Sequence, residues 1–188
     1  MITVYVVRHG EAEGNAKKKL MGQSDPSLTA IGKKDAYMLG ERLRSVKFDK
    51  VYTSDLERAW ATTDIIAKIL NLSLEPIKTE KLREIDTGDC CGMDLECFFR
   101  EYPESKNSAD FCFPKGESYR EFFCRIANFL KSLAKDYDDE IILIVAHEGV
   151  IKAIEYYFGY LEFRNHQKTK ISHEYVRKFV VDGGNPAE

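Results

Sequence analysis

The chain has 188 residues, of which 44% are hydrophobic and 31% charged, a composition typical of one globular domain with a buried core. Its formal net charge of -3 argues against nucleic acid or an anionic membrane as a partner, because both attract basic surfaces. No run approaches the roughly 20 apolar residues of a membrane span, the N-terminus lacks a signal-peptide layout, and the cysteines include no Cys-x-x-Cys pair.

The first part of the chain predicts two strands, each followed by a helix. Residues 2–7 form an apolar, β-rich run that is typical of a strand buried on both faces, and residues 49–53 form a weaker one. Apolar residues recur at helix spacing over 29–46, where Thr29 is a suitable N-cap. A second helix is predicted after Ser54-x-x-Glu57, which has the pattern of a capping box.

The rest of the chain continues this alternation. We predict a weak strand over 72–77, a helix after the capping-box pattern Ser118-x-x-Glu121, and a strong strand over 141–146. A helix over about 150–158 and a strand over 175–181 complete the chain. Alternating strands and helices predict an α/β fold, with a mainly parallel sheet between two helical layers. We expect one cytoplasmic domain over residues 1–188, with reduced thiols.

Four polar clusters directly follow predicted strands. Ligands of parallel α/β sheets bind at the carboxyl ends of the strands, so these clusters are expected to meet at one edge. They are Arg8-His9-Gly10-Glu11, Thr53-Ser54-Asp55 with Arg58, Arg83-Glu84, and His147-Glu148-Gly149.

The environment of His9 suits phosphoryl transfer. A neutral imidazole is a good nucleophile near neutral pH, and a neighbouring guanidinium such as that of Arg8 opposes its protonation. Arginine forks bind phosphate oxygens, so Arg8 and Arg58 could hold one phosphoryl group between them. Gly10 lets the backbone approach such a ligand closely.

Three further residues extend this hypothesis. His147 could donate a hydrogen bond from another strand, Asn15 offers an amide donor, and Glu84 could protonate the leaving oxygen and then take a proton from water. Taken singly, these residues also fit structural roles, as a hydrogen-bonded histidine or a loop ion pair. His166 and His173 keep that structural interpretation, because no polar cluster accompanies them in the sequence.

Taken in order, these motifs resemble the histidine phosphatase superfamily, the phosphoglycerate mutase-like proteins. The resemblance extends from residue 4 to about residue 153. It rests on these matches: Arg8-His9-Gly10-Glu11 with Asn15, Leu28-Thr29-x-x-Gly32, Thr53-Ser54-Asp55-Leu56-x-Arg58-Ala59-x-x-Thr62, Leu82-Arg83-Glu84-Ile85-Asp86 with Gly88, Gly116-Glu117-Ser118, and Val145-Ala146-His147 with Gly149-Val150-Ile151.

The resemblance implies a phosphoglycerate mutase-like fold and a role for each candidate residue. His9 would be the phosphorylated nucleophile and Glu84 the proton donor. The phosphate pocket would consist of Arg8, Asn15, Arg58 and His147. The resemblance implies no metal and no cofactor, because arginines and histidines supply the positive charge.

Some positions depart from the family pattern. Gly14 replaces an aromatic residue, and Cys90-Cys91 lies in a segment that is commonly aromatic near Glu84. Glu148 stands where glycine is common. Because a carboxylate there would repel a phosphate, we expect the Glu148 side chain to turn away from the pocket.

Within the family, the segment over about 85–116 favours a phosphatase. Mutases carry an insertion with extra basic residues after the position of Glu84, whereas this segment is short and contains only Arg100, Lys106 and Lys115. We predict that it forms a lid. Its aromatic residues would either contact an apolar part of the substrate or pack against the domain: Phe98, Phe99, Tyr102, Phe111 and Phe113.

The predicted function is that of a metal-independent phosphomonoester hydrolase of the histidine acid phosphatase type. It would act through a phosphohistidine on a small phosphorylated metabolite. A cofactor-dependent phosphoglycerate mutase and a non-catalytic member that binds phosphorylated ligands are the alternatives. The sequence leaves the substrate open, for example between a broad-specificity and an α-ribazole phosphate phosphatase, and it leaves a homodimer open.

Overall fold

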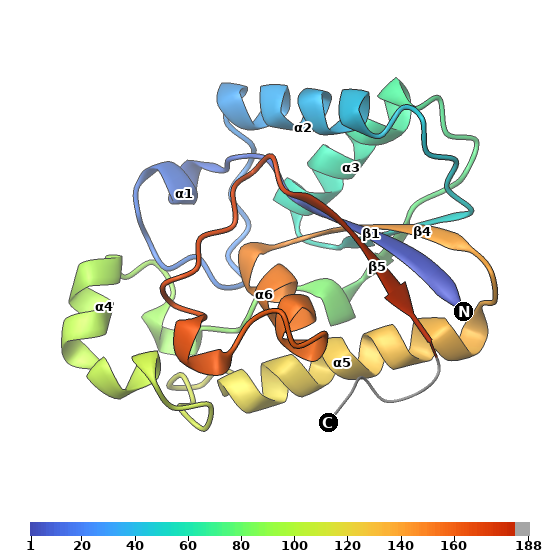
Figure 1. Ribbon diagram of the computed structural model, residues 1–188. Helices are drawn as coiled ribbons and strands as arrows, with labels where there is room; N and C mark the ends of the chain where they lie inside the picture. The colour runs from blue at the N-terminus through green and yellow to red at the C-terminus, as the bar shows by residue number, and fades with distance from the viewer. Residues whose placement is uncertain (183–188) are drawn as a thin grey trace.

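The computed structural model describes residues 1–182, so residues 183–188 of the predicted domain lie outside the described part. One five-stranded sheet runs through the molecule in the order β3-β2-β4-β1-β5 (Figure 1). Neighbouring strands are parallel except at one edge, where β5 runs antiparallel to β1. The prediction of a mainly parallel α/β sheet is therefore confirmed. The strands are β1 (Ile2–Arg8), β2 (Lys50–Ser54), β3 (Ile77–Thr79), β4 (Ile141–Ala146) and β5 (Val176–Val181).

Helices cover both faces of this sheet, which gives the predicted three layers (Figure 1). On one face lie α2 (Ala30–Arg42) and α3 (Glu57–Ile69), and on the other lie α5 (Tyr119–Asp136) and α6 (Glu148–Tyr157). The connections contain the short helices α1 (Glu13–Ala16) and α4 (Leu95–Glu101), and the 3-10 turns η1 (Glu80–Leu82), η2 (Gly88–Cys90), η3 (Pro103–Lys106) and η4 (Phe163–Asn165). Within residues 1–182, no helix is long and apolar enough to cross a membrane.

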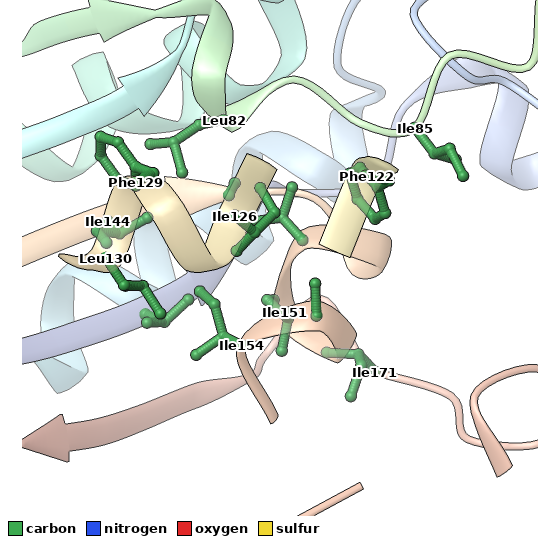
Figure 2. Close-up of a cluster of buried hydrophobic side chains, with 14 of the residues drawn as sticks. Leu82, Ile85, Phe122, Ile126, Phe129, Leu130, Ile144, Ile151, Ile154 and Ile171 are labelled. Atoms are coloured by element: carbon green, nitrogen blue, oxygen red, sulfur yellow. The ribbon is translucent and has the colours of Figure 1, made fainter. Parts of the chain in front are cut away.

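The apolar runs of the central strands serve two cores. Alternate side chains of a strand point to opposite faces. Ile142 and Ile144 accordingly join the core under α5 and α6, whereas Leu143 and Val145 join the core under α2 and α3. Figure 2 shows how the first of these cores packs Phe122, Ile126, Phe129 and Leu130 of α5 against Ile151 and Ile154 of α6.

Of the three helix starts that a capping signal predicted, two are correct. Thr29 caps α2 by accepting a hydrogen bond from Gly32 N, at 3.0 Å, and Ser118 and Glu121 form the predicted capping box of α5. The capping box at Ser54 is wrong. Helix α3 starts after Leu56, and the Ser54 hydroxyl instead accepts from Leu56 N within the turn that follows β2.

The predicted strand over 72–77 is also displaced. β3 begins only at Ile77 and pairs with β2 through Ser54↔Thr79. Pro76 has no N–H to donate to a ladder, and Leu72 and Leu74 pack against the core under α2 and α3 instead. Their apolar character therefore reflects packing against this core and not strand pairing.

The segment over 85–116 carries an aromatic cluster at one end of the molecule. Phe98 on α4 is 1% exposed, and its ring centroid lies 5.3–6.1 Å from those of Phe99, Tyr102, Phe111 and Phe113. These rings are therefore used largely in packing on one another. Phe99 and Phe113 also line the cavity described next.

Candidate active site

A cavity of about 730 Å³ opens beside the carboxyl ends of β1 and β4. His147, which follows β4, lies beside His9, with ring centroids 5.1 Å apart. The structure therefore brings all six predicted site residues together at the predicted edge of the sheet. The other members of this set line the cavity: Arg8, His9, Asn15, Arg58 and Glu84.

Two glycines determine the course of the chain after β1. A Cβ at Gly10 would lie 2.1 Å from Gly32 O, and one at Gly32 would lie 2.0 Å from Glu11 O. The loop can therefore pack directly on the first turn of α2 only because both residues lack a side chain. Gly10 N also donates to Thr62 Oγ1 at 3.0 Å, which ties the loop to α3. His9 is held on a rigid support as a result.

The ring of His9 is oriented by its own neighbour. Nδ1 lies 2.7 Å from Gly10 O, so Nδ1 carries the proton and donates it, which leaves the Nε2 lone pair free for attack. Burial, with further contributions from Arg58 and Arg8, holds the pKa of His9 well below its usual value. A neutral imidazole with a free Nε2 is the form that a nucleophile requires.

The ring of His147 is buried without a partner. It has no exposed surface, and neither ring nitrogen forms a hydrogen bond to any residue between 1 and 182. Burial and the charge of Arg58 lower its pKa well below the usual range. An unpaired polar group in the interior costs free energy and is uncommon in native proteins. We infer that the ring nitrogens of His147 are placed to meet a ligand.

The two arginines are fixed by backbone carbonyls. Arg58 donates from Nη1 to Ser24 O and from Nη2 to Gly22 O, the latter at 2.9 Å. Arg8 donates from Nη1 to Ile171 O, and its Nε is buried without a partner among the described residues. Burial lowers the pKa of both guanidinium groups, yet each stays cationic because arginine ionises far above neutral pH. They offer two fixed positive charges to an anion.

Asn15 reaches the cavity from α1. Its Oδ1 accepts a hydrogen bond from Ala12 N at 3.1 Å, which fixes the orientation of the side-chain amide. The amide nitrogen is then the group that remains to donate to a ligand. The role expected from the sequence, donation to a phosphoryl group, stays a prediction.

Glu84 is held at the start of α6. Its Oε1 accepts from Ile85 N at 2.9 Å, and its Oε2 accepts from Gly149 N at 3.0 Å. A Cβ at Gly149 would lie 2.1 Å from Oε1, so glycine is needed there to let the carboxylate approach the helix. Arg125, which the sequence analysis did not single out, supports the same segment by donating to Arg83 O and by pairing with Glu117.

The prediction for Glu148 is wrong. Its side chain does not turn away, because it lines the cavity and pairs with Arg8 at 3.0 Å and with Lys152 at 2.8 Å. The expectation rested on the cost of an unpaired like charge, whereas two cations, one on each side, neutralise this carboxylate. Lys152 had no sequence signal beyond its helical spacing from Glu148.

His173 is a site residue that the sequence analysis missed. Its Nδ1 lies 2.7 Å from His9 O, its ring centroid is 5.7 Å from that of His9, and it lines the cavity. His166 also lines the cavity, but its Nδ1 bonds Phe163 O and its ring stacks on Phe163, as its structural interpretation predicts. Nothing in the local sequence relates His173 to a loop more than 160 residues earlier.

The rest of the cavity wall combines aromatic and basic side chains. The aromatic rings are those of Phe99, Phe113, Tyr119, Phe122 and Phe123. The lysines are Lys18, Lys19, Lys152 and Lys170. Between residues 1 and 182, no group of three or more His, Cys, Asp or Glu side chains is arranged as metal ligands would be.

Comparison with known proteins identifies the family of the chain. The family model of the histidine phosphatase superfamily (branch 1) matches residues 4–187. The uncharacterized phosphatase PhoE of Bacillus subtilis is 33% identical over 154 residues, which are 82% of this chain and 76% of that protein. The probable phosphoglycerate mutase GpmB of Klebsiella pneumoniae is 35% identical over 154 residues, covering 78% and 70%.

A solved structure shares the whole fold. A mutant of phosphoserine phosphatase from Entamoeba histolytica, in complex with phosphoserine, superposes with a TM-score of 0.85 and 26% identity over 100% of this chain and 94% of that one. The chain belongs to the histidine phosphatase superfamily. The phosphatases among its relatives confirm the prediction of a phosphatase for small phosphorylated metabolites.

Proposed function

We propose that the protein hydrolyses phosphomonoesters through a phosphohistidine at His9, without a metal ion. The observation that carries this proposal is the free Nε2 of a buried, neutral His9, surrounded by the side chains of Arg8, Arg58 and His147. The polar atoms Arg8 Nε and both ring nitrogens of His147 have no partner in residues 1–182. A phosphoryl group would accept hydrogen bonds from Arg8 Nε and from whichever ring nitrogen of His147 carries the proton.

In the first step, His9 Nε2 attacks phosphorus, and the bond between phosphorus and the leaving oxygen breaks. Glu84, in its protonated form, gives its proton to that oxygen. In the second step, water attacks the phosphohistidine and passes a proton to Glu84, while the N–P bond breaks and returns its electron pair to Nε2. Inorganic phosphate leaves, and both residues regain their starting forms.

The fixed cations supply the electrostatic part of this scheme. Charge on the three equatorial oxygens is spread out in the transition state, and guanidinium forks bind such oxygens in the plane. Because Arg58 is already held by two backbone carbonyls, it needs little reorganisation when the charge develops. Asn15 would add a neutral donor to the same group.

A phosphoglycerate mutase remains the second candidate, because some relatives carry that name and four lysines line the cavity. In a mutase, a hydroxyl of a bound phosphoglycerate would accept the phosphoryl group in place of water. The non-catalytic alternative is less favoured, since the side chains that the proposed reaction would use lie together at the cavity.

Three finer features belong to the same proposal. Residues 1–188 would form a single domain in which the segment 85–116 acts as a lid over the cavity. The enzyme would be of the acid phosphatase type and cytoplasmic. Its partner would be a small phosphate ester and not nucleic acid, with a homodimer left open.

The test is hydrolysis of p-nitrophenyl phosphate by the purified protein, with and without EDTA and vanadate. We expect turnover that survives EDTA and is inhibited by vanadate, which resembles the trigonal bipyramidal transition state. Loss of activity in EDTA that magnesium or zinc restores would contradict the metal-free mechanism. Release of inorganic phosphate from 3-phosphoglycerate, without formation of its 2-isomer, would decide against the mutase.

A further inference from the structure

The carboxylate of Glu148 lies between two cations at the wall of the cavity. Oε2 is 3.0 Å from Arg8 Nη1, and Oε1 is 2.8 Å from Lys152 Nζ. The three side chains are 27% (Glu148), 10% (Arg8) and 12% (Lys152) exposed, so solvent screens these pairs less than it screens pairs on the open surface. The arrangement is therefore a partly buried row of cation, anion and cation.

The bonds of Arg8 show which edge of its guanidinium faces a ligand. Nη1 is committed on one side, because it donates to Ile171 O and pairs with Glu148. Nε, on the other edge, is buried without a partner among residues 1–182. The edge formed by Nε and Nη2 is the one that binds a phosphate with two parallel hydrogen bonds. Glu148 thus holds Arg8 by the edge that the phosphate does not need.

A carboxylate so close to a phosphoryl group is a liability unless its charge is neutralised. Like charges within a few ångströms repel each other strongly in a partly buried site. The positive charge of Arg8 is needed to attract the phosphoryl group, so Arg8 alone does not neutralise Glu148 as well. Lys152, one helical turn along α6, supplies the second positive charge.

We propose that Glu148 is a positioning residue that turns the Nε edge of Arg8 toward the phosphoryl group, and that Lys152 neutralises Glu148 so that it does not repel the substrate. This inference rests on the proposed function. It assigns a role to a carboxylate that, by charge alone, opposes phosphate binding. It also implies that Lys152 strengthens phosphate binding only when the carboxylate of Glu148 is present.

The experiment is a double-mutant cycle on the full-length protein. The variants are Lys152→Gln, Glu148→Gln and the two combined, with Glu148→Leu as the variant that loses the acceptor. Dissociation constants for vanadate are measured by calorimetry, KM and kcat with p-nitrophenyl phosphate, and folding by thermal melting. Lys170→Gln, alone and with Glu148→Gln, is the matched control, because Lys170 lines the same cavity and forms no ion pair with the described residues.

In the parent protein, Lys152→Gln should weaken vanadate binding and raise KM by about tenfold, since it exposes the phosphate to an unneutralised carboxylate. In the Glu148→Gln background, the same change should cost less than about twofold. Lys170→Gln should have the same effect in both backgrounds. Glu148→Gln, which keeps an acceptor for Arg8, should retain kcat, whereas Glu148→Leu should lower kcat and raise KM together.

Equal losses from Lys152→Gln in both backgrounds would overturn the inference, because Lys152 would then act on the ligand directly. Identical kinetics of Glu148→Gln and Glu148→Leu would also overturn it, because no positioning of Arg8 would be involved. These outcomes are distinct from a failure of the proposed function, which would appear as a parent protein that binds vanadate and turns over no phosphomonoester.

Discussion

At the carboxyl ends of β1 and β4, the buried side chains are charged or polar, and some of their atoms have no partner among residues 1–182. Around Phe98, in contrast, the buried side chains are aromatic and lie in edge-on and stacked contact with one another. The two regions border the same cavity, since His9 belongs to the first and Phe113 to the second.

The difference indicates that the polar region serves ligand binding, whereas the aromatic region serves the stability of the fold. Burial of unpaired nitrogens, as in His147, costs free energy that only a ligand would return. Burial of an aromatic side chain such as Phe98 stabilises the fold whether a ligand is present or not. Substitutions in the first region should therefore reduce activity more than stability, and those in the second should do the reverse.

The largest effect is expected from His9→Ala. Removal of the proposed nucleophile should lower kcat by a factor on the order of 10⁴ or more. The melting temperature should hardly change, because the His9 ring lines the cavity and therefore contributes little to the packing of the core. Measurement of kcat with p-nitrophenyl phosphate beside a thermal melt checks both statements. Residual activity above about one per cent of the parent would show that another nucleophile operates.

Glu84→Gln sharpens the comparison within the polar region. A general acid helps a basic leaving group by about 10²–10⁴-fold, whereas nitrophenolate is a stable anion that gains little. Turnover of alkyl phosphates should therefore fall far more than turnover of p-nitrophenyl phosphate. Both substrates are to be measured across pH 5 to 9 with the parent and the variant. Equal slowing of both would assign Glu84 to substrate positioning or to activation of water.

Phe98→Ala tests the aromatic region. Loss of a fully buried ring typically costs about 3–5 kcal/mol, and denaturant unfolding should show a loss of that size. The folded fraction should keep its kcat within about threefold, since Phe98 does not line the cavity. Phe99→Ala is the matched variant, because the neighbouring ring of Phe99 does line the cavity. A loss of activity without loss of stability in Phe98→Ala would mean that the predicted lid acts on the substrate through this residue.

A smaller effect is expected from pH. Burial lowers the pKa of both His9 and His147 well below the value of about 6.5 that they have in the unfolded chain. Below pH 6.5 the unfolded chain therefore binds protons that the folded protein does not, so stability falls as the pH falls, by up to about 1.4 kcal/mol per pH unit for each such histidine.

Thermal melts of the parent between pH 7.5 and 5.5 should show this decline, and His147→Asn should show a shallower one. A melting temperature that stays constant over this range would contradict the neutral state assigned to the buried imidazoles. The same neutrality implies that His9 remains a nucleophile at mildly acidic pH, as the acid phosphatase prediction requires.

The sequence was most informative where each residue acts from the end of its own strand or helix. His9, Arg58 and His147 follow β1, β2 and β4, and a parallel sheet brings such positions to one edge whatever the details of packing. Glycine spacing in the motifs also had a direct physical meaning, since Gly149 leaves room for the carboxylate of Glu84.

Contacts between segments that are distant in the chain were beyond the reach of sequence patterns. His173 reaches His9, and Ile171 O anchors Arg8, from a loop that has no motif of its own. The direction of Glu148 depended on which cations lay on either side of it, and the charge argument from sequence considered only the substrate. Strand propensity failed over 72–77 for a related reason, because Leu72 and Leu74 pack against the core under α2 and α3 without pairing in the sheet.

The most direct test of the account is to trap the covalent intermediate. The protein is mixed with a ³²P-labelled phosphomonoester and quenched, and the labelled residue is located by peptide mapping. We predict an acid-labile, base-stable phosphoryl group on His9, absent from His9→Ala and equally formed in the presence of EDTA. A label that survives acid, or one that maps to a residue other than His9, would contradict the phosphohistidine mechanism.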